Sequence, residues 1–408
     1  MRQTTYLTAA LGVLAQFFTE GSGAGIRPPY SRWMASSIMV RQQGIMTGNG
    51  GTSELLQAGF TQKAFLALLD QQPDAQSVRE YVQTSAESVV PFVLNATHDA
   101  LSYPLDRLSN GQALLELSSS STTGATEKNQ SFGAAADALR QSIDLNRRNP
   151  EGGLWYFVYP EWSYLDGMYS LAPFYTLYTK TRSGESEDAA AAKAALDDMY
   201  FQVDLLWRHT RHEETGLLVH GYDASRIAVW ADPHTGASPY VWDRALGWYF
   251  MALVDTLELL HSFEDGGEEG EGSEYEGPLL EKFQDLAKAV IAATDPATGA
   301  WWQIMDQPGR EGNYIESSGS AMFAYALLKG ARLGYLESYA SDAVRVGTRA
   351  QEYLTKTFVV HEKDDILGYN GTVSVCSLNS TATFEVRSTW TLFNDCSNVD
   401  VTGADVFV

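Results

Sequence analysis

Amphipathic segments with helical spacing follow one another along almost the whole of this 408-residue chain, and glycine or proline ends several of them. The pattern predicts about eleven helices, which span residues 31–43, 53–72, 75–95, 105–118, 131–146, 168–180, 187–210, 240–262, 278–294, 316–336 and 338–357. Alternation typical of strands occurs only near residues 372–376 and 383–386. Many helices of moderate length with so few strands predict an all-α bundle or toroid.

No linker divides the chain, so we expect residues 26–408 to form a single domain. The helices also lack a self-similar repeat of fixed period, which disfavours a solenoid of short repeats. Hydrophobic residues make up 44% of the chain and charged residues only 19%, a composition that can bury a sizeable core.

The chain is strongly acidic, with a formal net charge of −23 at pH 7. Such a charge repels phosphate backbones and anionic lipid surfaces, so we expect neither nucleic acid nor a membrane surface as a partner. Residues 264–277 contribute seven acidic side chains and no basic one. This segment is rich in glycine and glutamate and is predicted to be a solvated loop between two helices. Its acids lack the spacing of a calcium-binding loop.

The two ends of the chain predict export. Residues 1–25 combine one early base, a short apolar stretch and a run of small residues, which is typical of a secretory signal peptide. Cys376 and Cys396 are the only cysteines and would pair in an oxidising compartment. No Cys/His cluster suited to a metal is present, and no cofactor is expected. A secreted glycoprotein is also indicated by four glycosylation sequons, at Asn95, Asn129, Asn370 and Asn379.

Two carboxylates are candidates for acid–base chemistry. Asp166 lies among aromatic residues in the segment from Trp162 to Phe174, where desolvation would raise its pKa and allow proton donation near neutral pH. Asp106 follows Pro104 at the start of a predicted helix. Each of them could instead be an ordinary helix N-cap.

Aromatic residues make up 12% of the chain, and many of them lie in predicted loops, where exposed rings can stack on sugar faces. Arg244 and Trp248 are four residues apart and share a helical face, and Trp242 precedes them. An arginine beside such rings can bind a carboxylate, although it could equally cover Trp248 by cation–π packing. His220 is a further polar candidate, and a lone histidine is more often structural.

Several long motifs, in the same order, resemble glycoside hydrolase family 105, which contains the unsaturated rhamnogalacturonyl hydrolases. The resemblance covers roughly residues 30–400. It rests on Trp162-x-Tyr-Leu-Asp166-Gly-x-Tyr-x-x-x-Pro-Phe174, Trp242-x-Arg-Ala-Leu-Gly-Trp248-Tyr, Trp302-Gln-x-x-Asp306 and Asn313-Tyr-x-Glu-x-Ser-x-Ser320.

This resemblance implies an (α/α)6 barrel whose pocket takes an unsaturated uronic acid from the non-reducing end of a pectin fragment. Family members hydrate the C4–C5 double bond that a polysaccharide lyase leaves behind. Asp166 matches the general acid/base and Asp106 matches a second pocket carboxylate with an auxiliary role. The residues that match or neighbour pocket-lining positions are Tyr164, His220, Trp242, Arg244 and Trp248.

The chain ends at Val408, about where the last barrel helix is expected to begin. We therefore expect a barrel that lacks its last helix, with the apolar face of the 31–43 helix partly uncovered around Trp33, Met34 and Ile38, or covered by the signal segment or a partner. Two other functions remain open from the residues. One is an (α/α)6 glycosidase that uses Asp166 and Asp106 as acid and base on saturated sugars, and the other is a sugar-binding toroid without turnover.

Overall fold

The computed structural model describes residues 28–119, 127–183, 189–262 and 273–373. Their α-helices are α2 (Tyr30–Val40), α3 (Glu54–Gln71), α4 (Gln76–Val89), α5 (Ala96–Ser102), α6 (Gly111–Ser119), α7 (Glu127–Asp144), α8 (Asp166–Ser183), α9 (Ala189–Thr210), α10 (Asp243–Ser262), α11 (Ser273–Ala292), α12 (Ser317–Arg332) and α13 (Ala340–Phe358). The strands are short and form two antiparallel pairs, β1 (Trp162–Tyr164) with β2 (Gly221–Asp223) and β3 (Val359–His361) with β4 (Leu367–Tyr369).

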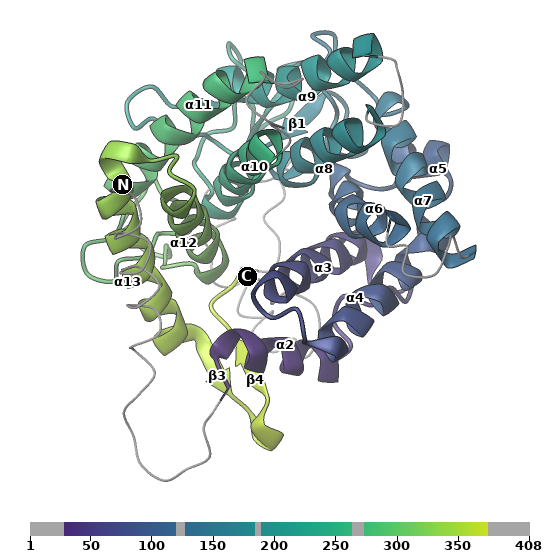
Figure 1. The fold of residues 1–408 in the computed structure, drawn as a ribbon. Helices are drawn as coiled ribbons and strands as arrows, with labels where there is room; N and C mark the ends of the chain where they lie inside the picture. Colours follow the sequence, from purple (N-terminus) through teal and green to yellow (C-terminus); the bar gives the residue numbers. More distant parts are fainter. Residues whose placement is uncertain (1–27, 120–126, 184–188, 263–272, 374–408) are drawn as a thin grey trace, which may run out of the picture.

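The helices form two concentric layers. In Figure 1, α3, α6, α8, α10 and α12 surround the centre, and α4, α7, α9, α11 and α13 lie outside them. Neighbouring inner helices pack on one another, as α8 and α12 do on α10, and each inner helix also packs on an outer one. This arrangement confirms the predicted all-α fold and is that of an (α/α)6 barrel. Because inner and outer helices alternate along the chain, the inner helices all run in the same direction.

Most of the predicted helices are present, but the local structure differs in three places. The short helix α5 was not predicted; Asn95 caps its first turn by accepting a hydrogen bond from the backbone N–H of His98 at 3.1 Å. The predicted 105–118 helix begins as a 3-10 helix, η3 (Leu105–Asn110), before α6. The helix predicted at 278–294 begins at Ser273, so the predicted acidic loop is shorter than expected.

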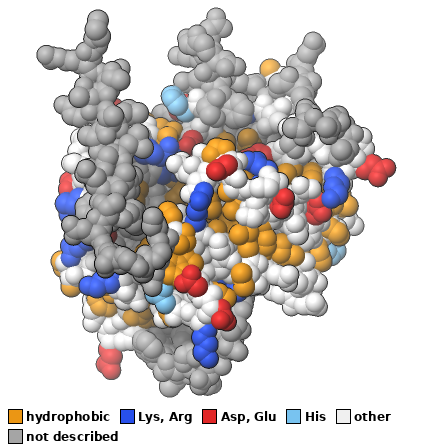
Figure 2. All heavy atoms as spheres, turned by 60° about the horizontal axis from the view of Figure 1, so that its bottom comes forward, with side chains coloured by type: hydrophobic (Ala, Val, Ile, Leu, Met, Phe, Trp, Pro, Cys, Tyr) orange, Lys and Arg blue, Asp and Glu red, His pale blue; other side chains and the backbone are white. Residues whose placement is uncertain are grey.

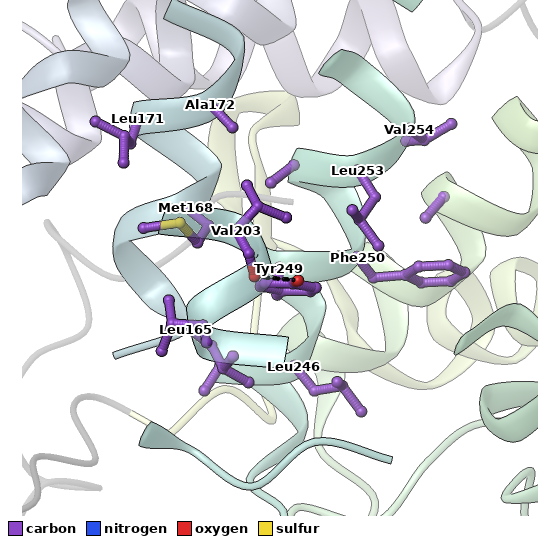
Figure 3. Close-up of a cluster of buried hydrophobic side chains, with 14 of the residues drawn as sticks. Leu165, Met168, Leu171, Ala172, Val203, Leu246, Tyr249, Phe250, Leu253 and Val254 are labelled. Atoms are coloured by element: carbon purple, nitrogen blue, oxygen red, sulfur yellow. Dashed lines mark hydrogen bonds between the residues drawn. The ribbon is translucent and has the colours of Figure 1, made fainter. Parts of the chain in front are cut away.

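A hydrophobic core fills the space between the inner and outer layers. Figure 3 shows Leu165 and Met168 of the α8 region, Val203 of α9, and Leu246 and Phe250 of α10 packed together, all of them buried. The Tyr249 hydroxyl of α10 lies within this cluster and donates a 2.8 Å hydrogen bond to the backbone oxygen of Val203. The core therefore holds α8, α9 and α10 in a fixed arrangement, on which the residues at the helix ends depend.

Ion pairs join three inner helices further along the barrel. Asp255 of α10 is 4% exposed and contacts Lys63 of α3 and, at 2.6 Å, Lys329 of α12. Burial opposes the ionised form of Asp255, but the two lysines outweigh burial and hold its pKa at about 2. The Tyr325 hydroxyl donates a further hydrogen bond to Asp255 at 2.8 Å.

The prediction that the apolar face of α2 is uncovered is wrong. Trp33 is 5% exposed and Ile38 is 6% exposed. One side of α2 packs on α3 and α4, and the β3–β4 hairpin covers another side. Within the hairpin, the Leu367 backbone N–H donates to the Ser37 hydroxyl at 2.9 Å, and the His361 ring packs edge-on against Trp33 at 5.1 Å. The predicted absence of a last helix concerns residues outside those described.

Other predictions also lie outside the described residues: the signal peptide at residues 1–25, both cysteines, the sequon at Asn379 and the strand at 383–386. Of the strand predicted at 372–376, the structure describes only Thr372 and Val373, which are not in a strand. On the face shown in Figure 2, charged side chains of both signs are scattered among hydrophobic ones. No helix of the described segments is long and apolar enough to cross a membrane.

Candidate active site

The predicted site residues gather at one end of the barrel, where the inner helices begin. Asp166 is the first residue of α8, Arg244 is the second residue of α10, and Asp106 lies in η3, which packs on α3 and α8. Strands β1 and β2 lie beside them, and Tyr164 pairs with Gly221, the residue after His220. Parallel inner helices therefore bring together residues that are up to 138 positions apart, from Asp106 to Arg244.

Asp106 and Asp166 form a pair of carboxyl groups in different environments. The Asp106 side chain is 6% exposed, and its Oδ2 accepts a 2.7 Å hydrogen bond from the Tyr156 hydroxyl. Burial raises the pKa of Asp106 to about 7, with a smaller upward contribution from the Asp166 carboxylate. Asp166 is more accessible, with 13% of its side chain exposed. Asp106 is therefore partly protonated near neutral pH, so the free site can hold a proton there.

His220 lies between the carboxyl pair and the aromatic residues. Its Nε2 is 3.1 Å from Oδ2 of Asp166, and its side chain is 1% exposed. The Tyr164 and Trp242 rings contact the imidazole at centroid distances of 4.7 and 4.9 Å. His220 is thus fixed against Asp166 and can orient its carboxylate.

Arg244 lies next to this group. Its guanidinium carbon is 5.3 Å from the centre of the Trp242 ring, which places the charge over the ring face. Nε donates to the Ser318 hydroxyl at 2.7 Å, and Nη2 lies 3.2 Å from Oε1 of Glu316. Arg244 is therefore held by α12 as well as by its own helix.

Trp248 lies one turn further along α10 than Arg244 and has a different set of neighbours. It packs on Tyr169 of α8 at 4.5 Å and meets Phe60 of α3 edge-on at 5.4 Å. These rings and two methionines, Met251 and Met322, form a buried cluster. Trp248 therefore belongs to the apolar layer behind the polar residues of the site.

Three residues that the sequence did not single out complete the polar site: Tyr156, Asp243 and Glu316. The sequence indicates Tyr156 only as one of several aromatic residues in a predicted loop, and Glu316 only as one position of a family motif. No sequence pattern singled out Asp243 as a site residue, although it adjoins Arg244. An acidic residue immediately before a candidate substrate-binding arginine is a signal that could have revealed it.

A further aromatic group extends away from Tyr164. Tyr156 stacks on Tyr164 at 5.0 Å, Trp162 stacks on Tyr159 at 5.1 Å, and Trp230 meets Trp162 edge-on at 5.0 Å. Tyr159 and Trp162 are half-buried, so part of each ring is accessible. These rings give the site an aromatic side of the kind that sugars bind.

The start of α3 contributes a loop of small residues, 47–52. Glu54 holds it by accepting hydrogen bonds from the backbone N–H groups of Gly48 and Gly50 at 3.0 and 3.1 Å. The same carboxylate accepts the Thr47 hydroxyl at 2.7 Å. The start of α3, next to this loop, adjoins η3: the Asn110 side chain donates to the Leu55 backbone oxygen at 2.9 Å. The Phe92 ring packs against this loop, since a Cβ added to Gly48 would lie 3.1 Å from it.

The described residues contain no group of three or more His, Cys, Asp or Glu side chains placed to hold a metal ion.

The sequence matches Glycosyl Hydrolase Family 88 over residues 32–390. A protein of Agrobacterium fabrum that carries only a locus name is 42% identical over 164 residues, which are 40% of this chain and 66% of that protein. A 24.9 kDa protein in the picA locus of Rhizobium radiobacter matches to the same extent. The matched segment is thus just under two thirds of either relative's length.

Solved structures give the same result. A family 105 glycoside hydrolase of C. acetobutylicum ATCC 824 is 28% identical with a TM-score of 0.67, covering 86% of this chain and 89% of that one. An unsaturated glucuronyl hydrolase of Bacillus sp. GL1 has a TM-score of 0.54 at 14% identity, covering 84% and 89%, and shows the fold alone. Because the family match extends over most of the chain, this protein belongs to glycosyl hydrolase family 88 and shares the (α/α)6 barrel of the family 105 enzymes.

Proposed function

We propose that this glycoside hydrolase removes an unsaturated uronic acid from the non-reducing end of lyase-generated rhamnogalacturonan fragments. The observation that carries the proposal is the pair of unlike carboxyl groups, buried Asp106 and accessible Asp166, at the mouth of the barrel. Hydration of an enol ether needs one proton donor and one proton acceptor close together, and Asp106 can hold a proton near neutral pH.

The proposed reaction adds water across the C4–C5 double bond. Asp166 receives the proton that the free site holds on Asp106 and gives it to C4, and the ring oxygen stabilises the cation that develops at C5. Water attacks C5 and returns a proton to the Asp166 carboxylate. The resulting hemiketal at C5 opens, and the neighbouring sugar leaves. Asp106 acts as the neighbouring proton store, and His220 keeps the Asp166 carboxyl in place.

Substrate binding in this proposal uses the remaining predicted residues. Arg244 takes the substrate carboxylate, because its guanidinium places a permanent positive charge beside the carboxyl pair and the Trp242 ring. Tyr164 and Trp242 offer ring faces beside the reacting sugar. The chain carries a net charge of −23, so this local cation must outweigh a general repulsion of an anionic substrate.

The test is incubation of the protein with lyase-treated rhamnogalacturonan, while the ultraviolet absorbance of the conjugated enol ether is followed. We expect the absorbance to fall and the reducing sugar to appear, with ¹⁸O from labelled water in the product of the unsaturated sugar. Fragments made by acid hydrolysis, which have saturated ends, are the control and should not react.

The other two functions predict different outcomes. A two-carboxylate glycosidase would also cleave the saturated control fragments. A binding protein without turnover would give a calorimetric signal with both the absorbance and the reducing ends unchanged. Reaction of unsaturated glycosaminoglycan fragments in place of pectin fragments would correct the proposed substrate but keep the reaction.

We also propose that the protein is secreted and glycosylated. Two of the four sequon asparagines, Asn95 and Asn370, are exposed, so both are accessible to a transferase. Digestion of the secreted protein with a glycosidase that removes N-linked chains should lower its apparent mass.

A further inference from the structure

Two fully buried carboxyl groups lie beside Arg244. Asp243 is the first residue of α10, Glu316 precedes the first residue of α12, and both are 0% exposed. Arg244 touches both, because its backbone N–H donates to Oδ1 of Asp243 at 2.8 Å and its Nη2 lies 3.2 Å from Oε1 of Glu316. One guanidinium cannot neutralise two buried carboxylates, so the group needs a further positive charge or a proton.

Glu316 has the surroundings of an ionised carboxylate. Oε1 accepts hydrogen bonds from the Ser318 hydroxyl at 2.9 Å and from the Val373 backbone N–H at 3.1 Å. Oε2 accepts from the Gly319 backbone N–H at 2.7 Å. Because Ser318 and Gly319 lie in the first turn of α12, the positive end of the helix dipole also favours the charge.

Asp243 has the opposite surroundings. Its Oδ2 is buried and accepts no hydrogen bond from any residue that the structure describes. The carboxyl is pressed against the start of α12, since a Cβ added to Gly319 would lie only 2.3 Å from Oδ2. Burial and the neighbouring Glu316 carboxylate raise the pKa of Asp243 well above its ordinary value. In the described part of the chain, the charged groups that face it are Glu316 of α12 and Arg244 of α10.

We propose that Asp243 is a protonated positioning residue, which shares its proton with Glu316 and so fixes the Arg244 guanidinium for the carboxylate of the substrate. A protonated Asp243 leaves one negative charge on the pair, and this charge matches the single charge of Arg244. An ionised Asp243 would add a second negative charge beside the place where the substrate carboxylate binds. The assignment of the substrate carboxylate to Arg244 rests on the proposed function.

This inference predicts how substrate binding depends on pH. When Asp243 loses its proton at alkaline pH, KM for the unsaturated substrate should rise, because the carboxylates repel the substrate. In Asp243→Asn the amide keeps the shape and a donor without the charge, so KM near neutral pH should stay within about threefold of the wild-type value and the alkaline rise should disappear. Asp243→Ala removes the donor beside a buried charge, and KM should rise by about tenfold or more with a smaller change in kcat.

The proton itself can be observed without turnover. Infrared difference spectra of wild type and Asp243→Asn at neutral pH should contain the carbonyl stretch of a buried carboxylic acid that only the wild type has. Asp306→Asn is the matched control, because Asp306 is a partly buried carboxylate that accepts the Val241 backbone N–H at 3.0 Å close to α10. This variant should retain both the Asp243 band and the alkaline rise in KM.

The results separate this inference from the proposed function. Turnover of the unsaturated substrate with no Asp243 band, or with the same alkaline rise of KM in wild type and Asp243→Asn, would overturn the inference and leave the function intact. The band without any turnover would confirm the protonated pair and refute the function proposed for it.

Discussion

The Tyr156 hydroxyl donates a 2.7 Å hydrogen bond to Oδ2 of Asp106, the more buried of the two candidate catalytic carboxyls. This hydrogen bond favours the ionised form of Asp106, whereas burial and the Asp166 carboxylate favour the protonated form. The balance places the pKa of Asp106 at about 7. Tyr156 therefore opposes the effect of burial on the protonation of Asp106.

Tyr156→Phe should move the alkaline limb of kcat/KM to higher pH. Loss of the donor raises the pKa of Asp106 above about 7, so the pair keeps its proton in more alkaline solution. A pH–rate profile on the unsaturated substrate measures the shift. Tyr159→Phe is a control in the same loop, since Tyr159 packs on Trp162. A limb that moves to lower pH would contradict this account of the pair.

Asp166→Asn should lower kcat by about 10²–10⁴-fold, because the amide cannot donate and recover a proton. Its shape is retained, so the dissociation constant of the substrate, measured by calorimetry, should change little. Retention of most of the wild-type rate would move the acid/base to another residue.

Arg244→Lys should raise KM much more than it lowers kcat. The ammonium of lysine cannot at once contact Ser318 and Glu316, lie flat over the Trp242 ring and present its charge to a substrate carboxylate. Initial rates over a range of substrate concentrations separate the two constants. An unchanged KM would remove Arg244 from substrate binding.

Asp106→Asn should stabilise the folded chain at alkaline pH while it impairs catalysis. The pKa of Asp106 is about 7 in the folded state and 3.8 without the protein environment, so the folded state binds more protons between these values. The free energy of unfolding of the wild type therefore falls as pH rises from about 4 to about 7, by up to roughly 4 kcal/mol.

Asparagine removes this dependence, so the difference between the variant and the wild type should grow between pH 4 and pH 8. Denaturant unfolding at several pH values measures it. A difference that stays constant over this range would show that Asp106 is not protonated in the folded chain.

Asp255→Ala should destabilise the barrel by about 3–5 kcal/mol, because it leaves Lys63 and Lys329 without their shared buried partner. Glu258→Gln is the control: Glu258 also contacts Lys329, at 2.6 Å, but is 39% exposed, so its loss should cost about 1 kcal/mol or less. Similar melting temperatures for Asp255→Ala and the wild type would show that the ion pairs contribute no net stability.

Helical periodicity was sufficient for most of the barrel, because long amphipathic helices depend on apolar spacing that is written in the sequence. The short elements were not predictable in the same way. Helix α5 depends on one cap at Asn95, and β1 exists only because Trp162–Tyr164 meets Gly221–Asp223 across the site. The covering of α2 by the β3–β4 hairpin is a tertiary contact that no local pattern records.

The site residues also divide into those that the sequence indicates and those that only the fold reveals. Motifs contain Asp166 and Arg244, and His220 was a lone polar candidate; the structure brings all three to one end of the barrel. Asp243 and Tyr156 act through neighbours that lie 73 and 50 positions away, Glu316 and Asp106. Their roles depend on burial and on neighbours that are distant in the sequence, and only the folded chain brings these residues together.

The hairpin contact with α2 also constrains the order of events during synthesis. Ser37 receives its hydrogen bond from Leu367, 330 residues later in the chain. At about 5–20 residues per second, a ribosome needs roughly 15–65 s to add that stretch. During this time the β3–β4 hairpin cannot yet cover its side of Trp33, so newly made α2 offers a surface that a chaperone can hold until the hairpin folds against it.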